Sequence, residues 1–203
     1  EDLVIVAGNV VLEGGKVTGS ITRDETNMDK MTYVYVESKK ELEGVTIGNG
    51  IKVLDNTEAD YVTFSAEAEQ TLTMSRAVET LEYSVDGGSW TELGTTIVTF
   101  GGDKGNLRLR GKSAIGTSTL NASSYFILGN NELPTACTGN ILTLVDYENY
   151  ESGTLDTSNV RFRNLFFGCN SLTSAPQLPA TVLADNCYFQ MFVYCYNLKE
   201  IPE

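Results

Sequence analysis

The sequence predicts a mainly β protein with three parts: a small N-terminal β module over residues 1–58, an antiparallel β-sandwich over residues 59–145, and a short repeat segment of strand-plus-helix coils over residues 146–203. Two observations predict this arrangement. Short apolar runs separated by glycine-rich turns fill the first two parts, which is typical of β structure. A motif of Phe, Cys, Leu and Pro then occurs twice before the end of the chain.

The N-terminal module is predicted from apolar runs that Gly-Asn and Gly-Gly pairs interrupt. LVIVAGNVVLEGGKVTGSITR (residues 3–23) holds both pairs, and VTIGNGIKVL (residues 45–54) brackets a Gly-Asn-Gly. Between them MTYVYVES (residues 31–38) alternates β-branched and aromatic residues. Because such pairs are the usual signal of tight hairpin turns, we expect short strands joined by hairpins. The best candidate for a linker is DNTEAD (residues 55–60).

The sandwich is predicted from strand patterns between residues 61 and 145, six or more of them at a spacing of about ten residues. In LEYSVDGGSWTEL (residues 81–93) two alternating runs flank Asp86-Gly87-Gly88, which predicts a hairpin with a turn of reversed hand. No amphipathic helix separates these strands, so a parallel α/β fold is not supported. We expect Trp90, the only tryptophan, to pack between the two sheets, with glycan binding as the alternative.

Composition excludes several classes of function. The chain has 14 basic and 27 acidic residues and a formal net charge of −13, so nucleic acid and anionic membranes are not expected partners. It has no histidine, which removes the usual Ser-His and Cys-His nucleophile pairs and the commonest zinc ligand. We expect no enzyme activity, no cofactor and no metal.

The ends of the sequence bear on its origin. No apolar run approaches the length of about 20 residues that spans a bilayer. The first residue is Glu1 rather than Met, and EDLVIVAGNVV (residues 1–11) lacks the basic start of a signal peptide. We therefore expect an excised or processed piece of a longer protein, whose targeting signal and anchor lie outside this chain.

The repeat is found by aligning the chain on itself. An offset of 26 residues pairs Phe166 with Phe192, Cys169 with Cys195, Leu172 with Leu198 and Pro176 with Pro202. The polar positions between them change freely, as they do in a repeat whose inward positions alone are constrained. A period of 26 lies in the range of about 20 to 29 residues of leucine-rich repeats, which have one strand and one helical segment in each coil.

A helix is predicted inside this unit. In TVLADNCYFQMF (residues 181–192) the apolar residues recur at helical spacing and form one stripe: Leu183, Ala184, Cys187, Tyr188, Met191 and Phe192. SLTSAP (residues 171–176) then has the pattern of the short strand, and QLPAT (residues 177–181) that of the connection. A coil cannot bury its apolar face alone, so we expect the sandwich to cap the first coil and the array to continue beyond Glu203 or end in a cap.

FFGCNSLTSAPQLPATVLADNCYFQMFVYCYNL (residues 166–198) resembles the 26-residue leucine-rich repeats of BspA-like bacterial surface proteins, in which a segment of the form MFxGCxSLTxAPxLPATxLAxxCY recurs. Tyr194 and Tyr196 stand where that pattern has small residues. The resemblance implies an exported protein of the bacterial cell surface, an outer-membrane lipoprotein, that is used for adhesion or ligand capture. Its membrane attachment would come only from an anchor outside this chain.

The four cysteines are too few and too far apart for a disulfide scaffold. We expect Cys169 and Cys195 to form a ladder of buried thiols in successive coils, with a Cys169–Cys195 bridge, or redox or metal chemistry, as alternatives. Cys187 should also be core. Cys137, in the apparent loop PTACTGN (residues 134–140), is the cysteine we expect to be reactive if any is.

Carboxylates and tyrosines supply the remaining candidate residues. Asp146, Glu148 and Glu151 could hold a calcium ion or act as an acid and a base, although their spacing fits no EF-hand loop and a solvated face is the simpler interpretation. The candidate ligand-binding residues are tyrosines in or near the repeat, which could stack on sugar rings or anchor a protein: Tyr147, Tyr150, Tyr194 and Tyr196.

The predicted function is therefore non-catalytic binding or adhesion, with an extracellular protein or a glycan as the partner. One alternative is a structural spacer, or N-terminal cap of a repeat array, with no ligand of its own. A carboxylate-based glycoside hydrolase is the third hypothesis.

Overall fold

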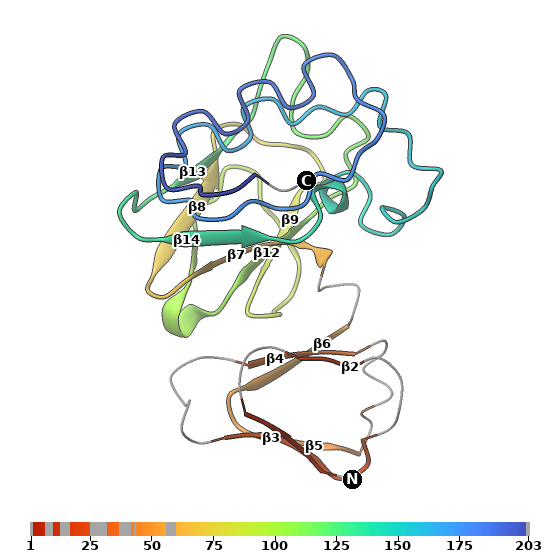
Figure 1. Ribbon diagram of the computed structural model, residues 1–203, viewed down its shortest axis with the longest axis vertical. Coiled ribbons are helices and arrows are strands. Elements are labelled where there is room, and N and C mark those ends of the chain that lie inside the picture. Colours follow the sequence, from red (N-terminus) through yellow and green to blue (C-terminus); the bar gives the residue numbers. More distant parts are fainter. Residues whose placement is uncertain are drawn as a thin grey trace. The chain divides into compact units, whose positions relative to one another are not determined.

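The computed structural model describes residues 2–6, 10–12, 17–24, 32–36, 42, 44–55 and 60–201 (Figure 1). The described chain is mainly β, and its helical elements η4 (Gly102–Lys104) and η5 (Ile141–Leu144) are short 3-10 helices. The mainly β class is therefore confirmed. The chain divides into two compact units, Glu1–Asp60 and Tyr61–Glu203.

The N-terminal unit is a parallel β-solenoid. Its strands are β1 (Leu3–Ile5), β2 (Val10–Leu12), β3 (Ser20–Arg23), β4 (Thr32–Val36), β5 (Thr46–Ile47) and β6 (Ile51–Asp55). One sheet has the order β1-β3-β5 and the other β2-β4-β6, and every neighbouring pair is parallel. Successive strands alternate between the two sheets, which face each other across a small apolar core that contains Ile5, Ile21, Val34, Val36 and Ile51 (Figure 1).

The hairpins predicted for this unit are wrong. The turn at Asn49-Gly50 connects β5 to β6, but these strands lie in different sheets, and each pairs with a strand of the preceding coil. The pairs Gly8-Asn9 and Gly14-Gly15 lie outside the described residues. A turn signal in the sequence shows where the chain bends. It does not show whether the next strand pairs with the last one or crosses to the opposite sheet, because burial between the sheets decides that.

The second unit contains two antiparallel sheets. The five-stranded sheet has the order β10-β9-β12-β7-β14, and the three-stranded sheet has the order β11-β8-β13. Their strands are β7 (Val62–Ala66), β8 (Gln70–Met74), β9 (Glu82–Val85), β10 (Thr91–Glu92), β11 (Val98–Phe100), β12 (Leu107–Arg110), β13 (Phe126–Leu128) and β14 (Thr135–Thr138).

The predicted hairpin between β9 and β10 is confirmed, because these strands pair in antiparallel register. Asp86 and Gly87 have φ angles of 51° and 65°, as a turn of reversed hand requires, and the Gly88 N–H donates to the Val85 carbonyl at 2.9 Å. Trp90 does not pack between the sheets as expected. Its ring lies against Tyr61, with the centroids 5.3 Å apart, and it is not part of the core that the two sheets share.

The two sheets share one apolar core with the repeat segment. Phe64 of β7 meets Phe126 of β13 edge to face at 5.3 Å, and Phe126 lies 5.3 Å from Phe166 of the repeat segment. All three rings are at most 1% exposed. Residues 146–201 thus pack as part of the second unit and have no core of their own.

The repeat segment is built from turns, so the helix predicted over residues 181–192 is wrong. The N–H groups of Cys187, Phe189 and Met191 each donate to the carbonyl three residues earlier. Asn186, Gln190 and Tyr194 have φ angles of 59°, 54° and 64°, and a left-handed residue at every fourth position interrupts any helix. In a run of four-residue turns, side chains point inward at nearly the same spacing as along one face of a helix. The apolar stripe therefore fits both structures, and this is why a helix was predicted.

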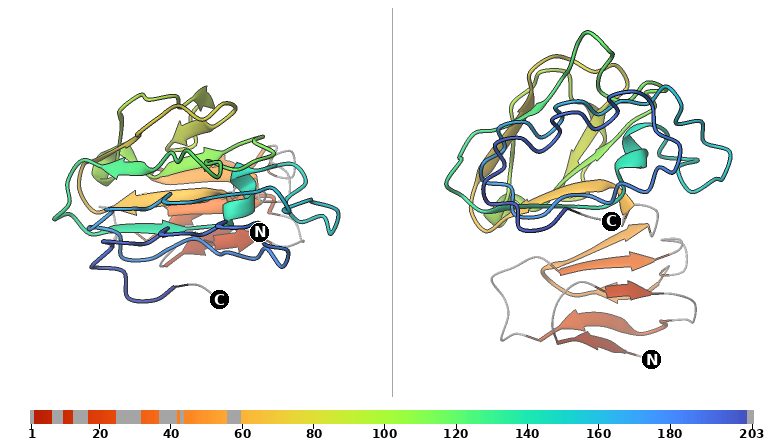
Figure 2. Two further views of the ribbon diagram at one scale, coloured as in Figure 1. Left: turned by 90° about the horizontal axis from the view of Figure 1, so that it is seen from above. Right: turned by 45° about the horizontal axis from the view of Figure 1, so that its top comes forward.

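Between the turns of the two copies of the repeat, residues 172–177 are extended, near where the short strand was predicted. Parallel bridges join Leu172 to Thr135 and Gln177 to Asn140, so this segment continues the five-stranded sheet past β14. Figure 2 shows the repeat segment, in blue, running in successive layers beside the strands of this unit.

Candidate binding surface on the repeat coils

The repeat segment forms two stacked coils, here called the first coil (residues 160–177) and the second coil (residues 186–201). Four backbone hydrogen bonds of 2.7 to 3.0 Å join them: Phe162 N–H to the Cys187 carbonyl, Asn164 to Phe189, Phe166 to Met191, and Gly168 to Val193. On the other side of the first coil, the Phe126 N–H donates to the Leu165 carbonyl at 2.8 Å. Strand β13 therefore occupies the place of a preceding coil.

Aromatic rings stack between the coils at the 26-residue offset. Phe166 and Phe192 lie 5.4 Å apart with ring planes inclined by 19°, and Phe162 and Tyr188 lie 6.3 Å apart at 7°. Phe126, Phe166 and Phe192 form a column of rings, and Phe162 and Tyr188 form a second stacked pair, so both sets constrain the spacing and rotation of the coils.

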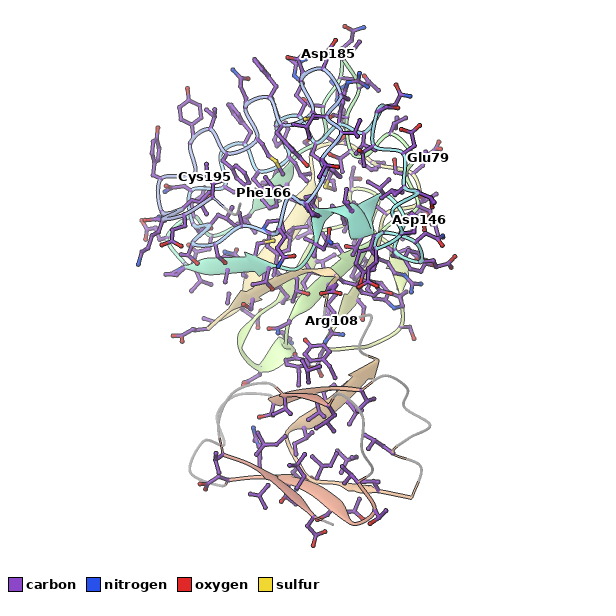
Figure 3. The ribbon with its side chains drawn as sticks, turned by 45° about the vertical axis from the view of Figure 1, so that its right-hand side comes forward. Glu79, Arg108, Asp146, Phe166, Asp185 and Cys195 are labelled. Atoms are coloured by element: carbon purple, nitrogen blue, oxygen red, sulfur yellow. The ribbon has the colours of Figure 1, made fainter. Side chains whose placement is uncertain are left out.

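The cysteines are free and buried. Cys169 Sγ donates to the Phe126 carbonyl at 3.5 Å and Cys195 Sγ to the Phe166 carbonyl at 3.0 Å, so each thiol bonds to the layer before its own. Figure 3 shows Phe166 and Cys195 close together on the coils. Burial raises the pKa of the Cys195 thiol to about 11, and it also raises the pKa of Cys169 and Cys187. Cys169, Cys187 and Cys195 are therefore buried core residues, as expected.

The expectation that Cys137 is the reactive cysteine is wrong. Cys137 lies in β14, is 0% exposed, and burial raises the pKa of its thiol well above the ordinary value. PTACTGN looks like a loop because Pro134 and Gly139 flank it. Its middle residues become a strand because they pair with β7 on one side and the first coil on the other.

An aromatic strip crosses the coils on the outside. Its members are Tyr125, Phe167, Tyr194 and Tyr196, and their successive ring centroids lie 6.4, 5.2 and 6.0 Å apart. Tyr125 and Phe167 are half-buried, whereas Tyr194 is 53% and Tyr196 76% exposed. The inner two rings therefore support the outer two, and the strip offers a firm apolar surface with phenolic hydroxyls at its edge.

The backbone explains why this strip projects. Tyr194 has a φ angle of 64° at the position where the first coil has Gly168, with a φ angle of 78°. The left-handed conformation at this position turns the side chain away from the column of rings inside the coil. Beside the strip, Asn197 Nδ2 donates to the Asn170 carbonyl at 2.8 Å and ties the two coils together.

The four tyrosines selected from the sequence do not form one site. Tyr194 and Tyr196 lie together, but Tyr150 is only 8% exposed, and its hydroxyl donates to Glu151 Oε1 at 3.3 Å. Tyr147 is half-buried, with the Arg110 guanidinium 4.2 Å from its ring centroid. Sequence reasoning missed Tyr125 and Phe167. Phe167 follows Phe166 directly, but no sequence signal links Tyr125 to a coil that begins 35 residues later (160 − 125 = 35).

A second cluster surrounds Tyr147. The Arg110 guanidinium lies between two rings, 4.2 Å from the centroids of both Trp90 and Tyr147, and its Nε donates to Glu82 at 2.8 Å. This aromatic and guanidinium stack holds β9, β12 and the segment after η5 together. The faces of the Trp90 and Tyr147 rings that contact Arg110 are therefore not available to a ligand.

The carboxylates of the predicted acid–base or calcium cluster bind a lysine. Lys112 Nζ lies 2.7 Å from both Asp146 Oδ1 and Glu148 Oε2. Partial burial acts to raise the pKa of Asp146, but hydrogen bonds from Lys112 and Asn149 outweigh it and lower that pKa. A carboxyl with a lowered pKa is a poor general acid at neutral pH. Among the described residues, no group of three His, Cys, Asp or Glu side chains is placed to hold a metal ion.

Comparisons with protein-family models, curated proteins and solved structures find no match to this chain. Within the described part of the chain, no helix has the length and apolar character needed to cross a membrane.

Proposed function

We propose that this chain is a non-catalytic binding module, and that the aromatic strip is its recognition surface. The observation that carries the proposal is the pair of exposed rings at Tyr194 and Tyr196, which Phe167 supports from within at 5.2 Å from Tyr194. Tyrosines held in place by neighbouring rings present a large contact area and lose little conformational entropy on binding, which is why tyrosine is enriched in recognition surfaces.

The proposal includes a finer description of the fold. The two antiparallel sheets would form a β-sandwich that closes the near end of a leucine-rich-repeat solenoid of the BspA-like type. In support, Phe162 and Tyr188 and also Phe166 and Phe192 stack at the 26-residue offset, and β13 bonds to the first coil. The location at a bacterial cell surface, as a lipoprotein whose anchor lies outside this chain, depends on the sequence resemblance alone.

The partner we propose is an extracellular protein or a glycan. Tyrosine faces stack on the apolar faces of sugar rings, and tyrosine side chains also act as anchors in protein interfaces. Nucleic acid is a poor candidate because the formal net charge is −13.

The test is a binding screen of the whole chain against arrays of host matrix proteins and glycans. The double variant Tyr194→Ala/Tyr196→Ala should lose at least tenfold in affinity for any hit, because two hot-spot side chains of the interface are removed. Phe189→Ala is the matched control, since Phe189 is 43% exposed on the same coil but outside the strip. Equal affinity of the wild type and the double variant would reject the strip as the binding surface.

A structural spacer or N-terminal cap is the alternative that one observation favours. The Phe126 N–H bonds to the Leu165 carbonyl, and the N–H groups of Thr117 and Ser118 both bond to the Arg161 carbonyl, so β13 and the connection before it lie against the first coil. If the chain acts only as such a cap, the screen returns no ligand that depends on Tyr194 and Tyr196.

A glycoside hydrolase that uses Asp146 and Glu148 is the weakest hypothesis, because both carboxylates bind Lys112. Hydrolysis of any polysaccharide that disappears in Glu148→Gln would support it.

A further inference from the structure

The aromatic strip continues onto the outward face of the three-stranded sheet. Burial alternates along β13: Phe126 and Leu128 are 1% and 4% exposed, whereas Ile127 between them is 42% exposed. Tyr125 precedes Phe126 and extends the pairing with β8, because the Ser75 N–H donates to its carbonyl at 2.9 Å. Successive residues of a strand point to opposite faces, so Tyr125 and Ile127 share the outward face. Tyr125 therefore joins the strip to this sheet.

The two other strands of the sheet add threonines to the same face. Ile127 pairs with Thr73 of β8, and two residues earlier on β8, Thr71 pairs with a threonine of β11. These partly exposed side chains alternate with buried ones on both strands. By the same alternation Ile97, just before β11, points outward and is 70% exposed. The outward residues are here called the threonine face: Thr71, Thr73, Ile97, Thr99 and Ile127.

The strip and the threonine face carry no charge. None of their residues is Lys, Arg, Asp or Glu, although 20% of the chain is charged. The five-stranded sheet differs, because Arg110 of β12 is paired with Glu82 of β9 at 2.8 Å. A charged ligand would meet no opposite charge on the strip or the threonine face, and the formal net charge of −13 repels anions. The surface therefore suits an uncharged ligand.

The threonine hydroxyls are available to such a ligand. Those of Thr71 and Thr99 have no hydrogen-bond partner within the part of the chain that the structure describes. Gly129 lies beside Thr71, where any side chain would crowd the hydroxyl. Thr73 Oγ1 donates to the Thr95 carbonyl at 3.0 Å and can still accept. Because a hydroxyl both donates and accepts, this face can bond to a ligand that is rich in hydroxyl groups.

Composition and shape favour a polysaccharide. Threonine is under-represented among the residues that contribute most to protein–protein affinity, and arginine, which is enriched there, is absent from the strip and the threonine face. The surface is open and several rings long, with neighbouring centroids of the strip 5.2 to 6.4 Å apart. A small ligand needs a pocket that encloses it, whereas a chain of sugars can lie along an open surface.

We infer that the aromatic strip and the threonine face form one surface that binds an uncharged polysaccharide. Sugar rings stack on Tyr194 and Tyr196, and sugar hydroxyls bond to the threonines. The inference rests on the proposed function, because it takes the strip as the recognition surface, and it specifies the class of ligand.

The experiment measures how far the whole chain migrates in native gels that each contain one polysaccharide. The uncharged probes are xyloglucan, galactomannan and dextran, and the charged probes are polygalacturonate and hyaluronate. Albumin in the same gels corrects for sieving. At least one uncharged probe should retard the chain, and neither charged probe should do so.

Ile127→Glu places a carboxylate within the threonine face. Its dissociation constant for the uncharged probe should rise at least tenfold. Ile115→Glu is the matched control: Ile115 is 50% exposed, and its carbonyl accepts the Arg161 N–H at 2.9 Å, outside the strip and the threonine face. Both isoleucines are exposed, so both variants should fold, and the control should bind as the wild type does.

Thr71→Val/Thr99→Val keeps the shape of the threonine face and removes two hydroxyls. The affinity should fall about tenfold, because two hydrogen bonds to the ligand are lost. If neither this variant nor Ile127→Glu weakens binding that Tyr194→Ala/Tyr196→Ala abolishes, the threonine face is not part of the surface and the inference is overturned.

The outcomes separate this inference from the proposed function. A lack of retardation by every uncharged probe overturns the inference. Binding of a protein or a charged glycan that depends on Tyr194 and Tyr196 also overturns it, but leaves the strip as a recognition surface. Binding of an uncharged probe that persists in Tyr194→Ala/Tyr196→Ala rejects the strip, and with it the proposed function.

Discussion

Phe166 stacks on Phe192 with the ring centroids 5.4 Å apart, and these two residues are separated by 26 positions in the chain (192 − 166 = 26). On its other side Phe166 meets Phe126 of β13 at 5.3 Å. One ring thus joins the antiparallel sheets to the coils. The stability of the second unit and the spacing of its coils should both depend on it.

Replacing Phe166 by alanine should therefore be strongly destabilising. The ring is 0% exposed, and removing a buried phenylalanine costs about 3–5 kcal/mol of the free energy of unfolding. Urea denaturation followed by circular dichroism measures this. Phe189→Ala, at a position that is 43% exposed, should cost less than about 1 kcal/mol. Similar losses in both variants would contradict the central place of Phe166.

The buried thiols predict a loss of stability at alkaline pH. Burial raises the pKa of Cys195 from 9.0 to about 11, and that of Cys137 and Cys169 also rises. A raised pKa in the folded state means that this stabilisation is complete below about pH 9 and is lost as the pH rises towards the folded-state value. Urea midpoints measured with a reductant at pH 7, 9 and 10 should fall in that order.

Cys195→Ala tests the origin of that fall. Its urea midpoint should change less between pH 9 and 10 than that of the wild type, because one raised pKa has been removed. An equal fall in both proteins would assign the effect to other groups.

Arg110→Lys should loosen the stack around Trp90. Lysine cannot place a planar group 4.2 Å from both the Trp90 and Tyr147 centroids while it also holds Glu82, and we expect a loss of about 1 kcal/mol. Because Trp90 is the only tryptophan, its fluorescence should shift to longer wavelength in the native state. Arg76→Lys, at an exposed arginine, is the control and should leave the emission unchanged.

Lys112→Met should raise the pKa of Asp146. Partial burial acts to raise this pKa, and the hydrogen bond from Lys112 is the main contribution that lowers it. A lowered pKa stabilises the fold above the ordinary value of 3.8, and this stabilisation is lost as the pH falls through the folded-state value. The variant should therefore lose less stability on acidification than the wild type. Carbon-detected NMR titration of the Asp146 carboxyl measures the shift, with Lys199→Met as an exposed-lysine control. An unchanged titration curve would exclude the pairing in solution.

The class and the repeat could be predicted from the sequence, but the local geometry of the repeat could not. Alternation of apolar residues and glycine-rich turns indicated β structure, and Asp86-Gly87 specified its hairpin because few residues tolerate a positive φ angle. The stripe from Leu183 to Phe192 indicated a buried face, and the structure buries or partly buries its members except Leu183, which is 57% exposed. The stripe could not separate a helix from a run of four-residue turns, since both bring an inward side chain round at about the same interval.

Only two of the four members of the aromatic strip were predicted from the sequence. Tyr194 and Tyr196 stood out as large residues at positions where the resembling repeats have small ones. Tyr147 and Tyr150 are close to the coils in sequence. However, Tyr147 packs against Arg110 and Tyr150 is buried, so neither belongs to the aromatic strip. Tyr125 reaches the strip because β13 takes the place of a preceding coil.

The sequence by itself determined the mainly β class, the 26-residue period and the inward positions of Phe166, Cys169 and Leu172, because burial constrains the residue types at those positions wherever the coils lie. The tertiary structure alone decided which strands are parallel and that β13 precedes the first coil. These features depend on which distant segments share hydrogen bonds, and backbone groups are the same at nearly every residue, so the order of side chains does not record their partners.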